Sequence, residues 1–249
     1  HSGMGGQANT NSTFGSTNLN GSILSVVSEN TTAGFSIGTY TGTGGLKTVG
    51  HGLGVVPALI MVKCRSNAVD WCVYHQNAAS SPEDGSLTLN DTAAFDDNDN
   101  RWNDTAPTSS VFTVYSSNEV NDSGFTYAYY AFAEIENFSK FGSYTGNGAA
   151  EDGPFVFTGF SPALVIIKET SEAGGSWFMW DNKREVGNVK DAVVWADAAN
   201  AETAHAEYEI DFLSNGFKIR GNSGGTNSNG QTNVYMAWAE HPFISANAR

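Results

Sequence analysis

The sequence has little charge, and most of that charge is negative. Charged residues make up 15% of the 249 residues, with 12 Lys+Arg against 26 Asp+Glu, for a formal net charge of −14. This balance argues against binding to nucleic acid or to an anionic membrane surface, because both need a basic face. No apolar run approaches the roughly 18 residues of a membrane-spanning helix, so we expect no membrane insertion.

Cysteine is also scarce. Cys64 and Cys72 are the only two in the chain, which is too few for a disulfide-based scaffold. The two thiols either pair across one hairpin or remain free, and the spacing leaves both alternatives open.

Glycine and aromatic residues are abundant instead. The chain holds 28 Gly, and aromatic residues reach 12%. Glycine and asparagine suit turns with positive φ, whereas aromatic and β-branched side chains favour strands. This composition predicts an all-β fold.

The chain also contains an internal duplication. Five blocks recur in the same order, four of them at a nearly constant offset of about 105 residues. We therefore predict two tandem homologous β-sandwich domains of jelly-roll or lectin-like type, residues 35–137 and 138–249, after a linker or N-terminal segment, residues 1–34. The paired blocks are 36–44 with 141–148, 56–63 with 161–168, Trp71 with Trp177, 124–125 with 216–217, and 129–134 with 235–240.

The blocks also indicate strands. In each copy the Tyr-Thr-Gly-x-Gly block is expected to form a strand that runs into a glycine turn, and the Pro-Ala-Leu block to form a buried strand. An Asn-Gly hairpin is predicted over residues 212–219. In the closing strand of the first copy, alternation places Tyr127, Tyr129 and Ala131 on one face.

A further set of motifs runs through residues 20–245. It includes 49–57 (VGHGLGVVP), 101–112 (RWNDTAPTSSVF), 138–148 (FSKFGSYTGNG), 153–160 (GPFVFTGF) and 239–243 (AEHPF). As a set it resembles a family of bacteriophage tail-fibre and virion structural proteins. The resemblance implies a place in the virion, in a phage tail or fibre that acts outside the cell, with other virion proteins as partners. A homotrimer is the usual state of such fibres, and no catalytic residues come with the resemblance.

An acidic cluster is the strongest candidate for a metal site. Asp96, Asp97 and Asp99 offer carboxylate oxygens of the kind that Ca²⁺ prefers. The EF-hand pattern is absent, so a calcium loop of another type and a solvated acidic loop remain the alternatives. We predict no other cofactor.

Tryptophans are the main candidates for ligand binding. Trp102, Trp180 and Trp195 lie beside polar loop residues and do not recur between the copies, which suits an exposed platform for a sugar ring. Trp71 and Trp177 do recur, so core packing is expected for these two. For His51, between two glycines, a packed turn residue is favoured over a ligand or base.

These observations favour a protein that is not an enzyme. The sequence lacks the H-E-x-x-H zinc motif. Our first hypothesis is a receptor-binding or adhesion module that recognises a host-surface glycan or protein. The alternatives are a purely structural virion or tail-assembly part, and a polysaccharide-degrading enzyme.

Overall fold

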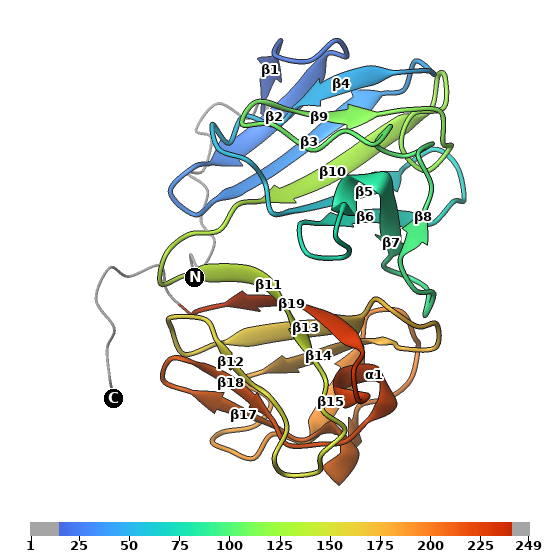
Figure 1. Cartoon of the computed structure of the whole chain (residues 1–249). Helices are drawn as coiled ribbons and strands as arrows, with labels where there is room; N and C mark the ends of the chain where they lie inside the picture. Colours follow the sequence, from blue (N-terminus) through green and yellow to red (C-terminus); the bar gives the residue numbers. More distant parts are fainter. Residues whose placement is uncertain (1–14, 241–249) are drawn as a thin grey trace. The chain divides into compact units, whose positions relative to one another are not determined.

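The computed structural model describes residues 15–240, which divide into two compact units. Within that range unit 1 comprises residues 15–88 and 96–134, and unit 2 comprises residues 89–95 and 135–240. Both units consist of short antiparallel strands (Figure 1). The predicted all-β class is therefore confirmed.

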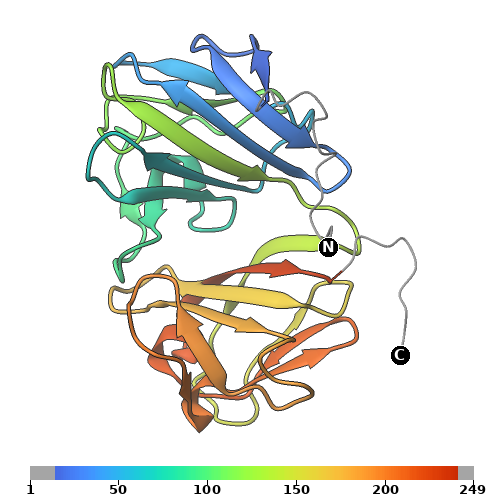
Figure 2. The ribbon, with the colours of Figure 1, turned by 180° about the vertical axis from the view of Figure 1, so that it is seen from behind.

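Unit 1 has a large sheet and a small one. The order in the large sheet is β1-β2-β3-β10-β5-β6-β7-β8, and β4 pairs with β9 in the small sheet. Figure 2 shows β1, β2 and β3 in blue beside the green β10. The strands are β1 (Ser16–Asn18), β2 (Ser25–Asn30), β3 (Phe35–Thr41), β4 (Lys47–Gly50), β5 (Leu59–Cys64), β6 (Trp71–His75), β7 (Gly85–Thr88), β8 (Asp96–Asp97), β9 (Val111–Val114) and β10 (Thr126–Phe132).

The core of unit 1 contains side chains from both of its sheets. Tyr127 and Tyr129 of β10 and Phe112 of β9 are almost completely buried in it. Ala131 is buried as well, which confirms the predicted face of the closing strand. Burial of such apolar surface is the main stabilising contribution to a sandwich-like unit.

Unit 2 is built in the same way. Its large sheet has the order β11-β19-β13-β14-β15-β16, and its small sheet the order β12-β18-β17. The single α-helix among residues 15–240 is α1 (Gly224–Asn227), and no helix in that range is long and apolar enough to cross a membrane. The strands are β11 (Ser139–Thr145), β12 (Phe155–Phe157), β13 (Leu164–Glu169), β14 (Trp177–Asp181), β15 (Ala192–Trp195), β16 (Thr203–Ala204), β17 (Ile210–Leu213), β18 (Gly216–Ile219) and β19 (Thr232–Trp238).

Four strands have the same order in both units. The order β3-β10-β5-β6 in unit 1 matches β11-β19-β13-β14 in unit 2. These strands carry the blocks that recur in the sequence, and the Pro-Ala-Leu blocks run into the buried strands β5 and β13 as expected.

The aromatic packing of the two cores also corresponds. The Phe112 and Tyr129 rings lie 5.2 Å apart at 70°, and the Phe217 and Tyr235 rings lie 5.3 Å apart at 78°. A Cβ on Gly38 would lie 2.5 Å from the Tyr129 ring, and one on Gly142 would lie 2.6 Å from the Tyr235 hydroxyl. Each copy therefore needs a glycine under its core tyrosine.

The glycine turns of the two units also contain equivalent hydrogen bonds. The Asn121 side-chain oxygen accepts from Thr43 N at 3.0 Å, and the Asn227 side-chain oxygen accepts from Asn147 N at 2.9 Å. Such agreement in strand order, ring packing and turn contacts supports a duplicated ancestor, although the duplication itself stays a prediction.

One of the five predicted block pairs is wrong. Gly124 N donates to Gly42 O at 2.9 Å, and the matching bond in unit 2 runs from Gly230 N to Gly146 O, also at 2.9 Å. Gly124 therefore corresponds to Gly230, and not to Gly216, which lies in β18. The hairpin predicted over residues 212–219 is present, with Leu213 opposite Gly216, so this glycine belongs to the strand and not to the turn.

The division into units differs from the predicted boundaries. Residues 15–34 of the predicted linker belong to unit 1, because they contain β1 and β2, whereas residues 1–14 lie outside the described range. Unit 1 ends at Glu134, and residues 89–95 belong to unit 2. Two hydrogen bonds of 2.9 Å hold residues 89–95 in unit 2. Phe95 N donates to Thr170 O, and Gly174 N donates to Thr92 O.

The two cysteines are free thiols in the core of unit 1. Cys64 in β5 and Cys72 in β6 are 2% and 1% exposed. Burial raises the pKa of Cys72 to about 12. Of the two alternatives, the structure therefore has two free thiols and no disulfide across the hairpin.

The units differ at one edge of the large sheet. In unit 1, β2 pairs with β3 along six residues. Residues 18–23, which lie between β1 and β2, reach the small sheet. Ile23 N donates to Thr48 O at 2.9 Å, and Ile23 forms a parallel bridge with Val49. In the described part of unit 2, no strand lies beside β11 or β12 on the corresponding side.

Candidate functional site

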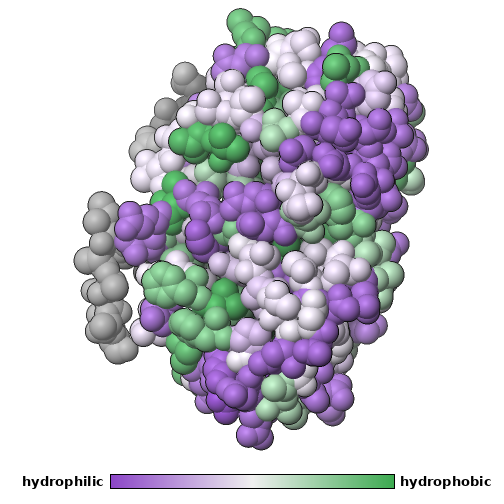
Figure 3. Space-filling model, viewed as in Figure 1, coloured by the Kyte–Doolittle hydropathy of each residue, from purple (hydrophilic) through white to green (hydrophobic). Residues whose placement is uncertain are grey.

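Two phenyl rings are exposed on the small sheet of unit 2. Phe155 and Phe157 are 48% and 64% exposed, and they are the only exposed aromatic residues between residues 15 and 240. They lie two residues apart in β12, so their side chains share one face of the strand. Figure 3 shows hydrophobic side chains over the part of unit 2 where β12 and β18 lie. We call Phe155 and Phe157 the phenyl pair.

The neighbouring strand leaves room beside the phenyl pair. β12 is the edge strand of its sheet and pairs with β18, with Phe155 opposite Lys218 and Phe157 opposite Gly216. Because glycine has no side chain, nothing on β18 covers the ring of Phe157 directly from the opposite position. The pair therefore forms a small apolar surface at a sheet edge.

Charged groups border the phenyl pair. Lys218 Nζ lies 3.0 Å from a carboxylate oxygen of Asp152, and Arg220 lies 3.6 Å from Asp211. Asp211 is the register partner of Lys218, so these groups continue along the same face of the sheet. The surface thus combines two aromatic rings with both donors and acceptors of hydrogen bonds.

Unit 1 covers the equivalent surface with its own chain. Val49 of β4 and Val156 of β12 correspond, because each packs in the core of its unit and pairs with a phenylalanine on the neighbouring strand. Thr48 and Gly50, on either side of Val49, therefore occupy the positions of Phe155 and Phe157. Ser22 N donates to Thr48 Oγ1 at 3.0 Å, and a Cβ on Gly50 would lie 2.2 Å from the Asn18 side chain. The phenyl pair is exposed because none of the described residues of unit 2 forms such a cover.

The structure corrects the predicted tryptophan platform. Trp102 and Trp180 are 2% and 1% exposed and belong to the cores of units 1 and 2. Trp195 is partly buried and packs against the core of unit 2. A ring that packs inside a core cannot stack on a ligand at the surface, so Trp102 and Trp180 are excluded as an exposed platform, and a binding role for Trp195 stays a prediction.

The recurring tryptophans differ in burial. Trp177 is completely buried, whereas Trp71 is partly exposed and lies outside the core of unit 1. Trp71 begins β6 opposite Lys63, and its ring lies 6.0 Å from that of Tyr130, on the face of the sheet that points away from the core. The expectation of core packing is therefore wrong for Trp71, whereas the completely buried Trp177 agrees with it.

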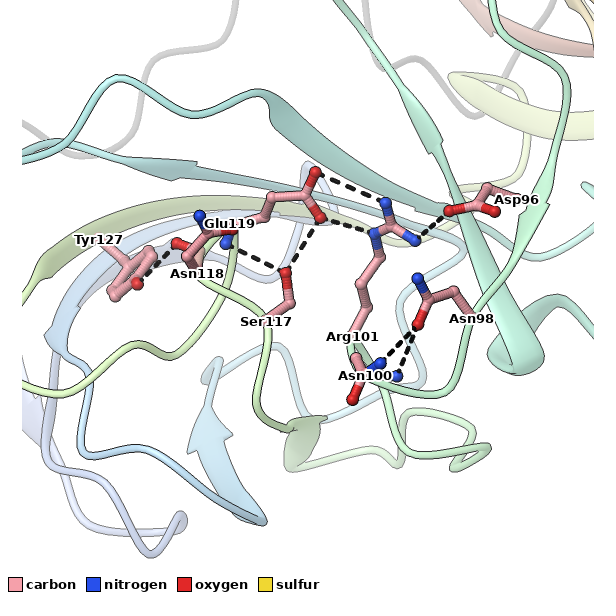
Figure 4. A network of polar contacts seen from close by, with 8 residues as sticks. All are labelled: Asp96, Asn98, Asn100, Arg101, Ser117, Asn118, Glu119 and Tyr127. Atoms are coloured by element: carbon pink, nitrogen blue, oxygen red, sulfur yellow. Dashed lines mark hydrogen bonds and ion pairs between the residues drawn. The ribbon is translucent and has the colours of Figure 1, made fainter.

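The structure also corrects the predicted calcium loop. No group of three or more His, Cys, Asp or Glu side chains in residues 15–240 is placed to hold a metal ion, so Asp96, Asp97 and Asp99 do not form one. The carboxylate of Asp96 instead lies 2.6 Å from Nη1 of Arg101 (Figure 4). The guanidinium of Arg101 therefore satisfies this carboxylate, one of the three candidate calcium ligands.

Arg101 is the centre of a polar network in unit 1. Its Nε donates to Glu119 at 2.7 Å, and the Ser117 hydroxyl donates to the same carboxylate oxygen at 3.1 Å (Figure 4). The Arg101 and Glu119 side chains are only 10% and 15% exposed. Arg101 thus satisfies two carboxylates, and the one of Glu119 is largely shielded from water.

His51 is a packed turn residue, as expected. It is completely buried, its Nε2 lies 3.1 Å from Thr108 O, and Leu53 N donates to its Nδ1 at 3.2 Å. Nε2 therefore carries the proton of a neutral ring. Burial lowers the pKa of His51, which favours this neutral form.

The phenyl pair was missed at the level of sequence. The motif 153–160 contains both rings, but Phe-Val-Phe alone does not tell which face of a strand is covered. Comparison of the two recurring halves could have found it, since Thr48 and Gly50 stand where the second half has two phenylalanines.

Comparison with known proteins gives one match. No curated protein and no solved structure matches the chain. A family model described as a domain of unknown function, DUF7483, matches residues 8–242 and so spans both units. The chain therefore belongs to the DUF7483 family.

Proposed function

We propose that the chain is a recognition module, not an enzyme, that binds a glycan on the surface of a host cell as part of a phage tail fibre or virion. The observation that carries this proposal is the exposure of Phe155 and Phe157 on one face of β12. Large exposed apolar groups with a polar border are typical of interaction sites.

The chemistry of the surface favours a sugar. The face of a phenyl ring is electron-rich, so it attracts the slightly positive C–H groups of a sugar ring. Lys218 can donate and Asp152 can accept hydrogen bonds from the sugar hydroxyls, and the carboxylate of Asp152 is 91% exposed. Each contact is weak, and several copies of the module on one particle would multiply it into avidity.

The test uses the fluorescently labelled chain and candidate host cells. Burial of one phenyl side chain is worth about 1.5–3 kcal/mol. The double variant Phe155→Ser/Phe157→Ser is therefore expected to lower cell binding by roughly 100-fold at unchanged thermal stability. The matched control is Val186→Ser, which removes a 98% exposed apolar side chain from the loop between β14 and β15 of the same unit.

Pretreatment of the cells separates the classes of ligand. Periodate oxidation should abolish binding if the receptor is a glycan, whereas protease treatment should abolish it if the receptor is a protein. Equal binding of the double variant and the wild type would refute the phenyl pair as the binding surface. Release of reducing ends from host polysaccharide would show an enzyme instead.

A further inference from the structure

The open edge of β11 in unit 2 corresponds to a paired edge in unit 1. β2 lies antiparallel to β3 there, with Ser25 opposite Tyr40 and Val27 opposite Gly38. Both β2 side chains point into the core and are at most 1% exposed. The strand β2 is thus an integral part of the sandwich, and its place is empty of described residues in unit 2.

The hydrogen-bonding groups at this edge can be assigned. Gly146 N donates to Gln231 O, and Ala239 N donates to Phe138 O, so the even-numbered residues of β11 direct their backbone groups to β19. Consecutive residues of an antiparallel strand alternate in this respect. The N–H and C=O groups of Ser143 and Thr145 therefore point to the open edge, and both residues are exposed.

The side chains at the edge show the same difference. Tyr40 is 4% exposed and Gly38 is buried, whereas their counterparts Tyr144 and Gly142 are both partly exposed. The contacts of the two tyrosines are otherwise alike, because the Tyr40 hydroxyl donates to Val120 O and the Tyr144 hydroxyl to Thr226 O. The greater exposure in unit 2 thus follows from the missing strand.

We propose that the open edge of β11 binds an extended segment of another polypeptide chain, which adds to the sheet antiparallel to β11, where β2 lies in unit 1. Main-chain hydrogen bonds to Ser143 and Thr145 would supply affinity, and side-chain fit would supply specificity. By the register of unit 1, the segment carries a small residue opposite Tyr144 and a β-branched residue opposite Gly142.

We assign the segment to a different chain. Every strand among residues 15–240 is already paired in a sheet, so none of the described strands is free to occupy this edge. A free edge with exposed main-chain groups is normally blocked in a monomeric protein by a charge, a proline or a covering loop. Ser143 and Thr145 offer no such block. This inference does not depend on a glycan ligand.

The probe is a labelled peptide with the sequence of residues 21–30, which contains β2. We expect it to bind the full chain in a fluorescence anisotropy titration. Ser143→Pro removes one edge N–H and leaves the pairing of β11 with β19 intact, so it should weaken binding at least tenfold. Ser143→Ala is the matched control, because it keeps the N–H and should bind as the wild type does.

A second measurement needs no variant. The peptide should slow hydrogen exchange at the amides of Ser143 and Thr145 in the wild-type chain. Lack of peptide binding, or equal binding by the proline and alanine variants, would overturn the proposal. If analytical sedimentation showed a dimer of the wild-type chain and a monomer of Ser143→Pro, the edge would bind a second copy of this chain. That result would overturn its assignment to a different protein.

Discussion

Trp180→Ala is expected to destabilise unit 2 by about 3–5 kcal/mol, the range for loss of a buried tryptophan. Trp180 is 1% exposed in the core, and its ring stacks on that of Phe178 at 5.9 Å and 15°. Its Nε1 donates to Tyr208 O at 3.0 Å, so truncation also leaves a carbonyl without its donor. A cavity and an unsatisfied acceptor therefore add to the loss of buried area.

The measurement is the free energy of unfolding from hydrogen exchange at the amides of β13 and β19, which report on unit 2. Trp195→Ala is the control, because this side chain packs only partly against the same core and should cost less. If Trp180→Ala left the stability of unit 2 unchanged and weakened cell binding, Trp180 would be part of an exposed binding surface. That result would contradict its burial.

Arg101→Met is expected to destabilise unit 1 by about 3 kcal/mol. The substitution leaves the carboxylate of Glu119, with a side chain only 15% exposed, without its cationic partner. Asp96 is 56% exposed and returns to water at little cost, so most of the effect arises at Glu119.

The double variant Arg101→Met/Glu119→Met separates the pair from its parts. Removal of both charges avoids an unpaired buried carboxylate, so the double variant should be more stable than Arg101→Met in urea unfolding. If the double variant lost as much as the sum of the two single variants, the network would not be coupled as its geometry indicates. Addition of Ca²⁺ should leave both values unchanged.

The strand framework could be predicted from the sequence, since its signals are local. The Tyr-Thr-Gly-x-Gly and Pro-Ala-Leu blocks combine turn residues with strand-forming side chains, and they became β3, β5, β11 and β13. Their recurrence at one offset also placed them in equivalent positions. Alternation in the closing strand assigned Tyr127 and Tyr129 to the core face for the same reason.

The site could not be predicted, because exposure is decided by distant parts of the chain. Trp102 and Trp180 lie beside polar residues in sequence, yet their rings turn into the cores. Asp96 is satisfied by Arg101, five residues further along, and the spacing of the acids gave no hint of this. Phe155 and Phe157 are exposed because the cover present in unit 1 has no counterpart among the described residues of unit 2.

Both proposed binding surfaces arise from one difference between the two units. Unit 1 covers the edge of β3 and the outer face of β4 with residues 18–30, and unit 2 leaves the equivalent edge of β11 and face of β12 without a described cover. The exposed phenyl pair and the open strand edge both follow from it. Two units that share the order of four strands therefore carry different surfaces, and the binding roles proposed above belong to unit 2.

Native-state hydrogen exchange tests this difference most directly. Thr39 and Ser143 occupy equivalent positions, but Thr39 faces Val26 of β2 whereas Ser143 faces the open edge. We predict that the amides of Ser143 and Thr145 exchange at least 100-fold faster than those of Thr39 and Thr41 in the isolated chain, because a strand hydrogen bond protects only the latter pair. Equal protection at the two pairs would contradict the account.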